Sequence, residues 1–316
     1  MRMSQQKSQK SWFAVVNPRS ANGKTQGLWP GYYQQLQQVG IQVDYALTSR
    51  SGGGTEITRM ALDEGYRRMI AVGGDGTVNE VLNGLIENDR LVADDIELAV
   101  FEQGTGGDFV RTIKTGKEKG LNALIRMLKE PNIILSDLGR VDFLNFEGEE
   151  RIRYFLNASN VGVGAEAVHR TNCRSKAMGS KLSYLTSTLE AVLSYKSACV
   201  SLKMDRDTFW EGNIWGLMVC NGQYIGGGMH IAPDARLDDG FFDLVVIKEM
   251  KLSRLFTRFP LLYKGQHIHL PEVQVFRCKE IELHMPDFML FETDGEIPGV
   301  CPKAYRVIPK CLKLWV

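Results

Sequence analysis

The segment that most restricts the fold of this chain runs from residue 67 to residue 86, RRMIAVGGDGTVNEVLNGLI. It opens with a short apolar run from Met69 to Val72, which is typical of a buried strand. A glycine turn, GGDGT, follows at 73–77, and apolar residues then recur at helical spacing up to Ile86. Thr77 and Glu80 have the spacing of a capping box, which predicts a helix that begins at Thr77. The segment therefore reads as a strand, a turn and a helix in immediate succession.

The residues of this turn favour a phosphate ligand. A glycine turn at a helix N-terminus presents backbone N–H groups and the positive end of the helix dipole. Asp75 inside the turn does not suit a bare phosphate, but it suits a metal ion held between phosphates, or a proton network. The turn lacks the patterns of a Walker A loop and of a G-x-G-x-x-G dinucleotide site. An ordinary glycine turn between a strand and a helix is the alternative.

Composition excludes several classes of protein. The 316 residues are 44% hydrophobic and 24% charged, as in a soluble globular protein with two domains of ordinary size. A net charge of +1 gives no case for nucleic acid as a partner. No apolar run approaches the length of a membrane span. Residues 1–10 are polar, lack the apolar core of a signal peptide, and are expected to be a flexible tail. Six scattered cysteines without a C-x-x-C pair predict reduced thiols in a cytoplasmic protein.

Residues 11–137 are expected to form an α/β nucleotide-binding domain. Strands are predicted at 12–16, 41–47, 69–72 and 96–101, and helices at 25–38, after the glycines at 52–54, and after the turn at 73–77. This alternation implies parallel strands in a doubly wound sheet. Ligands bind at the carboxyl ends of such strands, and all four strands end in polar segments, most of them rich in glycine.

Residues 138–303 are expected to form a mostly β domain, a sandwich. Its predicted strands are 154–159, 198–204, 214–220, 242–247, 273–276 and 281–285, separated by turn signals. Two helices interrupt them, at 181–196 and at 251–264, the second kinked or ended by Pro260. The strand-like residues 304–316 are expected to return to the first domain. His267 and His269 are expected on one side of an extended segment, at the surface or in the core rather than at a metal site.

Four further segments carry candidate site residues. The loop 17–24, NPRSANGK, offers backbone donors, hydroxyls and cations for phosphate, and the loop 104–108, GTGGD, offers a hydroxyl and an acid. A plain turn and a flexible loop are the respective alternatives. The segments 238–241, DDGF, and 293–299, TDGEIPG, have the composition of hairpin turns. Adjacent carboxylates and turn carbonyls in the first could also hold a hard cation, and the acids of the second matter if they lie near Asp75.

Taken in order, these segments resemble the diacylglycerol kinase catalytic-domain family, in its bacterial soluble lipid kinase branch, with sphingosine and ceramide kinases as relatives. GGDGT alone is only moderately specific, since NAD kinases and phosphofructokinases resemble it, whereas the ordered set is specific. The set spans nearly the whole chain. The matching segments are VVNPRSANGK (15–24), AVGGDGTVNEVLNG (71–84), GTGGDFVRT (104–112), FLNASNVGVGAEA (155–167), NGQYIGGGMHIAPDARLDDGFFDLVVI (221–247) and DGE (294–296).

The resemblance implies an active site in a cleft between the two domains, with ATP and Mg²⁺ used to phosphorylate a lipid hydroxyl. Asp75 and Asp108 match acids that family members use in the active site, and Glu296 matches the proposed general base. Together with the phosphate-side loop, the residues expected to bind the nucleotide are Asn17, Pro18, Ser20, Lys24, Thr48, Gly73, Gly74, Asp75, Gly76, Thr77, Asn79, Glu80 and Thr105.

The resemblance also implies a structural Mg²⁺ site in the second domain. Asp239 matches its acid, with the carbonyl oxygens of Arg236 and Phe241 as further ligands. The chain departs from the family pattern at Gly107, where members often carry Asn just before the acid that corresponds to Asp108. This departure removes one side-chain contact from the expected set.

A lipid kinase without a membrane span must take its substrate from a bilayer surface, which implies a peripheral location at the inner membrane. Two basic segments without acids, 169–181 and 251–271, are candidates for docking there, and a solvated basic face packed on the core is the alternative. Two other functions stay open: a soluble-substrate kinase similar to NAD kinases, and a catalytically dead nucleotide-binding regulator. The sequence identifies neither the lipid, which is expected to be diacylglycerol-like, nor the oligomeric state, for which a homodimer is a common outcome.

Overall fold

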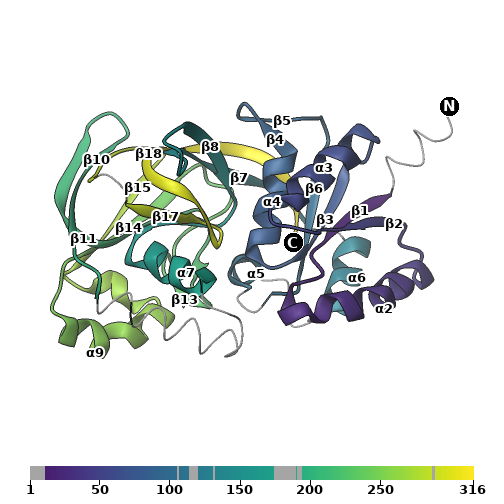
Figure 1. The fold of residues 1–316 in the computed structure, drawn as a ribbon, viewed down its shortest axis with the longest axis horizontal. Helices are drawn as coiled ribbons and strands as arrows, with labels where there is room; N and C mark the ends of the chain where they lie inside the picture. Colours follow the sequence, from purple (N-terminus) through teal and green to yellow (C-terminus); the bar gives the residue numbers. More distant parts are fainter. Residues whose placement is uncertain are drawn as a thin grey trace. The chain divides into compact units, whose positions relative to one another are not determined.

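The computed structural model (Figure 1) describes residues 11–104, 107–113, 120–130, 132–173, 190, 194–286 and 289–316. The chain divides into two compact units, Met1–Ser136 with Lys310–Val316, and Asp137–Pro309. The expected tail at 1–10 and most of the expected helix at 181–196 lie outside the described residues. Among the described residues, no helix has both the length and the apolar character that crossing a bilayer requires.

The first unit is built on a parallel sheet, as predicted. Its strands are β1 (Trp12–Val16), β2 (Val43–Leu47), β3 (Arg68–Gly73), β6 (Glu97–Glu102) and the end of β18 (Glu296–Trp315). They lie side by side in the order β18, β6, β3, β1, β2, and every pair is parallel. Val16 lies opposite both Leu47 and Val72, so β1, β2 and β3 end at the same edge of the sheet.

Helices cover both faces of this sheet. They are η1 (Ala21–Gly23), α2 (Lys24–Gln38), α3 (Gly53–Asp63), α4 (Asp75–Leu85), α5 (Asp108–Ile113) and α6 (Leu121–Lys129), and a short hairpin of β4 (Ile86–Glu87) and β5 (Arg90–Leu91) follows α4. Trp29 of α2 and Leu124 of α6 join Ala14 and Ile70 of the sheet in one buried cluster. The helices α3 and α4 pack together on the opposite face (Figure 1). The doubly wound arrangement is therefore confirmed.

The second unit is mostly β, as predicted. Its strands are β7 (Ile133–Leu144), which starts in the first unit, β8 (Glu150–Phe155), β9 (Ala158–Gly162), β10 (Ala198–Met204), β11 (Thr208–Cys220), β12 (Tyr224–Ile225), β13 (Met229–His230), β14 (Phe242–Lys248), β15 (Val273–Cys278), β16 (Glu280–His284), β17 (Leu290–Thr293) and most of β18. Antiparallel pairing runs from β11 through β10, β16, β18, β17 and β9 back to β11. The strands enclose an apolar core that includes Phe155, Leu217, Phe242, Phe291 and Tyr305.

Three local predictions in the second unit need correction. The predicted strand 154–159 is broken, because the backbone N–H groups of Leu156 and Asn157 donate to the Asp294 carboxylate instead of to a neighbouring strand. Pro260 does not end its helix, since α9 (Leu252–Tyr263) continues beyond it. The C-terminal strand-like pieces form one strand, β18, of which residues 304–309 stay in the second unit while Lys310–Val316 belong to the first.

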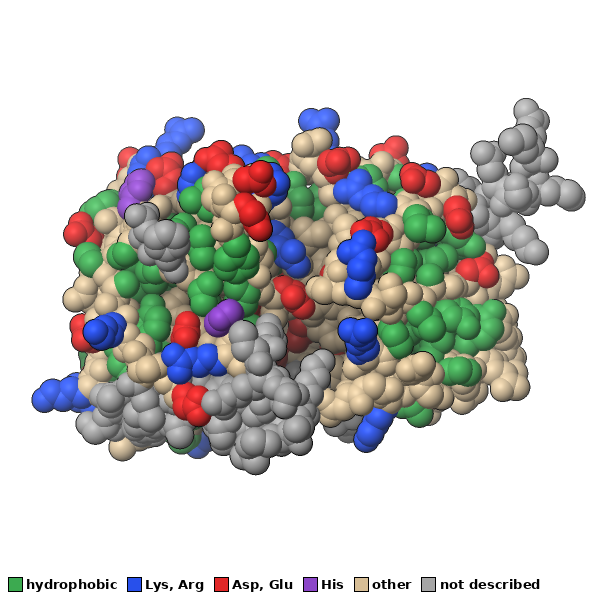
Figure 2. All heavy atoms as spheres, viewed as in Figure 1, with side chains coloured by type: hydrophobic (Ala, Val, Ile, Leu, Met, Phe, Trp, Pro, Cys, Tyr) green, Lys and Arg blue, Asp and Glu red, His purple; other side chains and the backbone are tan. Residues whose placement is uncertain are grey.

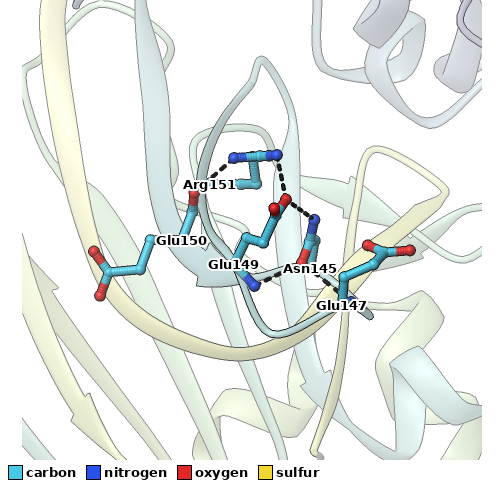
Figure 3. Close-up of polar contacts among 5 residues, drawn as sticks. All are labelled: Asn145, Glu147, Glu149, Glu150 and Arg151. Atoms are coloured by element: carbon cyan, nitrogen blue, oxygen red, sulfur yellow. Dashed lines mark hydrogen bonds and ion pairs between the residues drawn. The ribbon is translucent and has the colours of Figure 1, made fainter.

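The turn that joins β7 to β8 shows how local polar residues fix a hairpin (Figure 3). The Asn145 side-chain oxygen accepts the backbone N–H groups of Glu147 and Glu149, and its amide nitrogen donates to the Glu149 carboxylate. Arg151 pairs with the same carboxylate. Asn commonly closes turns in this way, because its side chain satisfies backbone groups that leave the ladder.

The end of β18 is fixed in the first unit by aromatic and polar contacts. The Trp315 ring packs edge-on against the Trp12 ring at a centroid distance of 4.8 Å, and the Arg68 guanidinium lies 5.8 Å from both rings. The Trp315 indole N–H donates to Glu97 at 3.1 Å, and only 5% of Trp315 is exposed. The last strand is therefore part of the core of the first unit.

We predict that Trp315→Ala lowers the free energy of unfolding by about 3–5 kcal/mol, because it removes a buried aromatic side chain and leaves a cavity beside Trp12. Equilibrium urea unfolding measures this loss. Phe209→Ala is the matched control, since Phe209 is 64% exposed and its loss should cost little. A Trp315 variant as stable as the control would contradict this account of the core.

Candidate active site

The order of the strands places a ligand-binding edge between β1 and β3. From β1 the chain passes through α2 to β2 on one side, and then through α3 to β3 on the other side of β1. Because α2 and α3 cover opposite faces, the carboxyl ends of β1 and β3 form the topological switch point of the sheet, where doubly wound folds bind ligands. The loop that starts at Asn17 follows β1, and the glycine turn follows β3.

The glycine turn opens α4 with a glycine as the N-cap residue. The helix begins at Asp75, and the extended Gly74 before it has no side chain that could bond to the first turn. The predicted capping box is therefore wrong. Thr77 already lies within the helix, where its hydroxyl accepts a hydrogen bond from the Asn17 amide at 3.0 Å, and Glu80 bonds elsewhere. Helix N–H groups that no side chain caps are suited to an anionic ligand.

Close packing at the turn requires two glycines. A Cβ at Gly73 would lie 2.2 Å from the Thr77 hydroxyl oxygen, and a Cβ at Gly104 would lie 2.8 Å from the Gly74 Cα. The segment after β6 therefore passes directly over the turn. This close packing explains why the turn needs glycine, independently of any ligand.

The loop after β1 is fixed by its own polar groups. The Ser20 hydroxyl donates to the Asn17 carbonyl at 2.8 Å and lies 2.7 Å from the Thr25 hydroxyl. Pro18 is half-buried, and Lys24 is exposed at the start of α2. Through its bond to Thr77, Asn17 joins this loop to the glycine turn, so the structure brings these two predicted nucleotide segments together.

Some residues predicted to bind the nucleotide are buried or bond to protein groups. The Glu80 carboxylate accepts the backbone N–H groups of Gly52 at 2.7 Å and Gly54 at 2.8 Å, and so caps α3 from a neighbouring helix. Asn79 is fully buried, and Thr48 is 8% exposed beside Gly53. Thr105 lies outside the described residues.

Asp75 and Asp108 are brought together at this edge. Asp75 lies in the first turn of α4, and Asp108 begins α5. The backbone N–H of Phe109 donates to an oxygen of the Asp75 carboxylate at 3.5 Å, which joins the two helix starts. Asp108 is only 6% exposed, and the Arg111 guanidinium approaches its carboxylate to 4.0 Å.

A third acid, Glu102, lies beside this pair and was missed in the sequence analysis. Its carboxylate accepts the backbone N–H of Gly104, and the loop passes so close that a Cβ at Gly107 would lie 3.3 Å from the Glu102 Cγ. Burial, reinforced by the nearby Asp108 charge, raises the pKa of Glu102 to about 7. A signal was present, because Glu102 directly follows the predicted strand 96–101, at the edge where ligands bind.

In the second unit, Glu296 lies at a tight turn. It is the first residue of β18 and pairs with Thr293, the last residue of β17. Asp294 and Gly295 connect the two strands, so the hairpin that was the alternative reading of this segment is present. Glu296 is half-buried, whereas Glu292 and Asp294 are each 5% exposed.

The described contacts at Asp239 do not favour a divalent ion. One carboxylate oxygen accepts the Phe241 N–H at 3.1 Å, and the other accepts from the Arg277 guanidinium at 2.6 Å. Lys279 lies 4.7 Å from the Phe241 ring, and Arg236 pairs with the neighbouring Asp238. With protein cations already beside this turn, the metal site at Arg236, Asp239 and Phe241 stays a prediction without structural support.

Several cations of the two basic segments, 169–181 and 251–271, are paired with acids of this chain. Arg254 and Arg258 of α9 both pair with Glu272, at 2.8 Å and 2.5 Å. Arg170 pairs with Glu166 on α7 (Val163–Cys173), and residues 174–181 lie outside the described part of the chain. On the face drawn in Figure 2, Lys and Arg side chains are interspersed with Asp and Glu.

The two histidines of the H-x-H segment do not share one side, because the segment is a short 3₁₀ helix, η3 (Gln266–His269), rather than an extended strand. His267 is buried, with a ring nitrogen 3.0 Å from the Ile231 carbonyl oxygen, and His269 is exposed. Across the described residues, no group of three or more His, Cys, Asp or Glu side chains could hold a metal ion.

Comparison with known proteins places both parts of the chain in characterised families. Residues 11–141 match the model of the diacylglycerol kinase catalytic domain. Residues 158–316 match the YegS C-terminal NAD kinase beta sandwich-like domain. The sandwich-like character of the predicted second domain is thereby confirmed.

Individual relatives agree with these matches. A diacylglycerol kinase from Staphylococcus carnosus is 26% identical over 95% of this chain and 93% of its own length. A diacylglycerol kinase from Bacillus subtilis is 27% identical over 91% of this chain and 90% of its own. The fold is shared with a diacylglycerol kinase structure from Bacillus anthracis, with a TM-score of 0.68 and 19% identity over 96% of each chain. The chain is therefore a kinase that combines a diacylglycerol kinase catalytic domain with a YegS C-terminal NAD kinase beta sandwich-like domain, and it belongs to the family that this second domain defines.

Proposed function

We propose that this kinase transfers the γ-phosphoryl group of ATP to the hydroxyl of a diacylglycerol-like lipid, with Mg²⁺ as cofactor. The observation that carries the proposal is the glycine turn at the start of α4, which lies at the switch point of the sheet with Asp75 and Asp108 beside it. Phosphoryl transfer depends mostly on positioning the phosphate and on neutralising its charge. At this edge, backbone amides could position the phosphate, and the two carboxylates could hold a metal ion that neutralises its charge. The names of the two bacterial relatives support a lipid as the acceptor.

The residues of the first unit fit a nucleotide phosphate. The amides of the glycine turn and the start of α4 would bind it, and this backbone is closely packed at Gly73 and Gly104. Asn17 and Ser20 would hold the facing loop in place. Asp75 and Asp108 are the carboxylates that would hold a Mg²⁺ ion, and the bound ion would neutralise charge on the phosphates.

Glu296 is the residue proposed to accept the proton of the lipid hydroxyl. It is half-buried, so its carboxylate can be reached by a substrate, whereas Glu292 and Asp294 beside it are almost fully buried. An ionised carboxylate can act as a general base when it lies at hydrogen-bonding distance from the hydroxyl. The remaining two acids of this turn are better suited to supporting it.

The proposal includes where the enzyme works. A diacylglycerol-like substrate lies in a bilayer, so the protein would act from the cytoplasm at the inner membrane surface. Lys251 and Lys264, exposed at the two ends of α9, are the cations of that segment that would face anionic lipid, since Arg254 and Arg258 pair with Glu272. A homodimer is proposed as the assembly on general grounds only.

We predict that Glu296→Gln abolishes lipid phosphorylation while ATP still binds, because the amide keeps the shape of the side chain but cannot accept the hydroxyl proton. Phosphate transfer to diacylglycerol in mixed micelles measures turnover, and calorimetric titration measures ATP binding. Glu249→Gln, which changes an exposed acid after β14 in the same unit, is the control. Turnover of the Glu296 variant close to that of the control would remove Glu296 from the role.

A second prediction concerns the pKa of Glu102. Its value of about 7 exceeds the ordinary value of 4.5, so between these pH values the folded chain holds a proton that the unfolded chain has released. Folding stability is therefore expected to fall as pH rises through this window. Glu102→Gln should remove this loss and stabilise the chain by about 1–3 kcal/mol near pH 8, with little effect near pH 4.

Urea unfolding at the two pH values tests this prediction. Glu130→Gln, at an exposed position after α6, is the matched control and should change stability equally at both. If Glu102→Gln behaves like the control, folding does not raise the pKa of Glu102, and its carboxylate carries a full negative charge at neutral pH.

A further inference from the structure

The turn that carries Glu296 has a backbone that few residues adopt. Asp294 and Gly295 both have positive φ, at 46° and 88°, between the paired residues Thr293 and Glu296. Two-residue hairpin turns with this geometry favour Asp-Gly or Asn-Gly, because other side chains are strained there. Local geometry alone therefore explains an Asp or an Asn at position 294, but it does not explain what the carboxylate does.

The Asp294 carboxylate is buried and accepts three successive backbone N–H groups. Leu156 donates to one oxygen at 2.9 Å, and Asn157 and Ala158 donate to the other at 3.0 Å and 3.1 Å. The backbone N–H of Asp294 in turn donates to the Ala158 carbonyl at 3.0 Å. These amides lie where the chain leaves β8 for β9, so without the carboxylate three buried donors would lose their acceptor.

The bend at 156–158 is itself held from the other side. Asn221, which is fully buried, donates from its side chain to the Leu156 carbonyl at 2.7 Å and to the Asp137 carbonyl at 3.0 Å. The side chain of Asn157 donates to the Tyr224 carbonyl at 2.8 Å. The partners of Asp294 are thus anchored to β7 and β12, and the carboxylate connects the turn to a rigid support.

A second buried acid holds the same turn. The Glu292 carboxylate accepts the backbone N–H of Gly295 and the side-chain amide of Asn160. Glu292 therefore fixes Gly295, which directly precedes Glu296. Asp294, which precedes Gly295, is fixed by its own carboxylate. Two buried carboxylates at one two-residue turn exceed what closing a hairpin requires.

We propose that Asp294 is a positioning residue, whose carboxylate fixes the turn so that the Glu296 side chain points where the lipid hydroxyl must lie. This inference rests on the proposed role of Glu296 as general base. An Asn side chain has one oxygen acceptor instead of two, so it can satisfy only some of the three amides. The turn would then relax, and a displacement of about 1 Å at a catalytic group can cost about 100-fold in rate.

Asp205 offers a matched control in the same unit. It lies after β10 in a turn, also has a positive φ, 51°, and accepts the backbone N–H groups of Lys279 and Glu280 at 2.9 Å and 3.0 Å. Asp205→Asn therefore makes the same chemical change at an exposed turn that also binds two backbone amides, on a hairpin that carries no proposed site residue. It measures what such a change does to folding alone.

The experiment compares Asp294→Asn, Asp205→Asn, Glu296→Gln and the unaltered protein, using kcat, the KM for ATP and thermal unfolding. We expect kcat of Asp294→Asn to fall about 10- to 100-fold with the KM for ATP within about twofold, while Asp205→Asn keeps its kcat. Hydrogen exchange of the amides at 156–158 should accelerate in Asp294→Asn alone. A folded Asp294→Asn protein with kcat within about twofold of the unaltered protein overturns the proposal.

If Asp294→Asn does not fold, Asp294→Glu decides the question. Its carboxylate lies one methylene away from the three amides, so kcat should still fall at least about fivefold, and an unchanged kcat overturns the proposal. Failure of the proposed function has a different signature. In that case the unaltered protein phosphorylates no lipid, or Glu296→Gln stays active, whatever the result at position 294.

Discussion

The structure depends on one constraint, which is that α4 starts from a glycine turn at the switch point of a parallel sheet, with Gly74 as its N-cap residue. Helix N–H groups that lack partners inside the helix need an acceptor, and most helices supply one from the side chain of the N-cap residue. Gly74 has no side chain to do so, Thr77 bonds to Asn17, and Glu80 caps α3. The glycine turn is therefore suited to an anionic ligand, and it packs closely against Thr77 and Gly104.

Acids in both units accept backbone N–H groups, with different consequences. In the first unit, burial beside Asp108 raises the pKa of Glu102 to about 7, which limits the negative charge near a turn that should bind phosphate. In the second unit, the oxygens of Asp294 and Glu292 accept hydrogen bonds from backbone N–H groups and from the Asn160 side chain, and Glu296 lies half-buried next to them. The same chemical group therefore serves as structural support, as a candidate metal ligand and as a candidate base, depending on burial and partners.

Much of the fold followed from sequence because its signals are local. The apolar run Met69–Val72 and its glycine turn defined a strand and a helix, and the alternation of such units defined the parallel sheet. The errors came from contacts between distant residues. Glu80 finds donors 26 and 28 residues away, and the strand predicted at 154–159 breaks because Asp294, more than 130 residues later, binds its amides.

In the candidate site, too, local motifs identified some residues, whereas others depend on contacts that the sequence does not reveal. Asp75, Asp108 and Glu296 were found by motif, but Glu102 was missed because it lies outside the glycine motif that follows it. The basic helix expected to dock on membranes has two of its cations paired with Glu272, an acid just beyond the segment considered. Pairing of this kind depends on where the chain folds back, which periodicity does not reveal.

The central claim is that this chain phosphorylates a lipid hydroxyl, and product identification tests it most directly. Purified protein would be incubated with labelled ATP, Mg²⁺ and a panel that contains diacylglycerol, phosphatidylglycerol, sphingoid bases, ceramide and NAD. The account predicts label in a lipid phosphate monoester, with diacylglycerol as the preferred acceptor. Label in NADP, or ATP hydrolysis that no lipid stimulates, would contradict it.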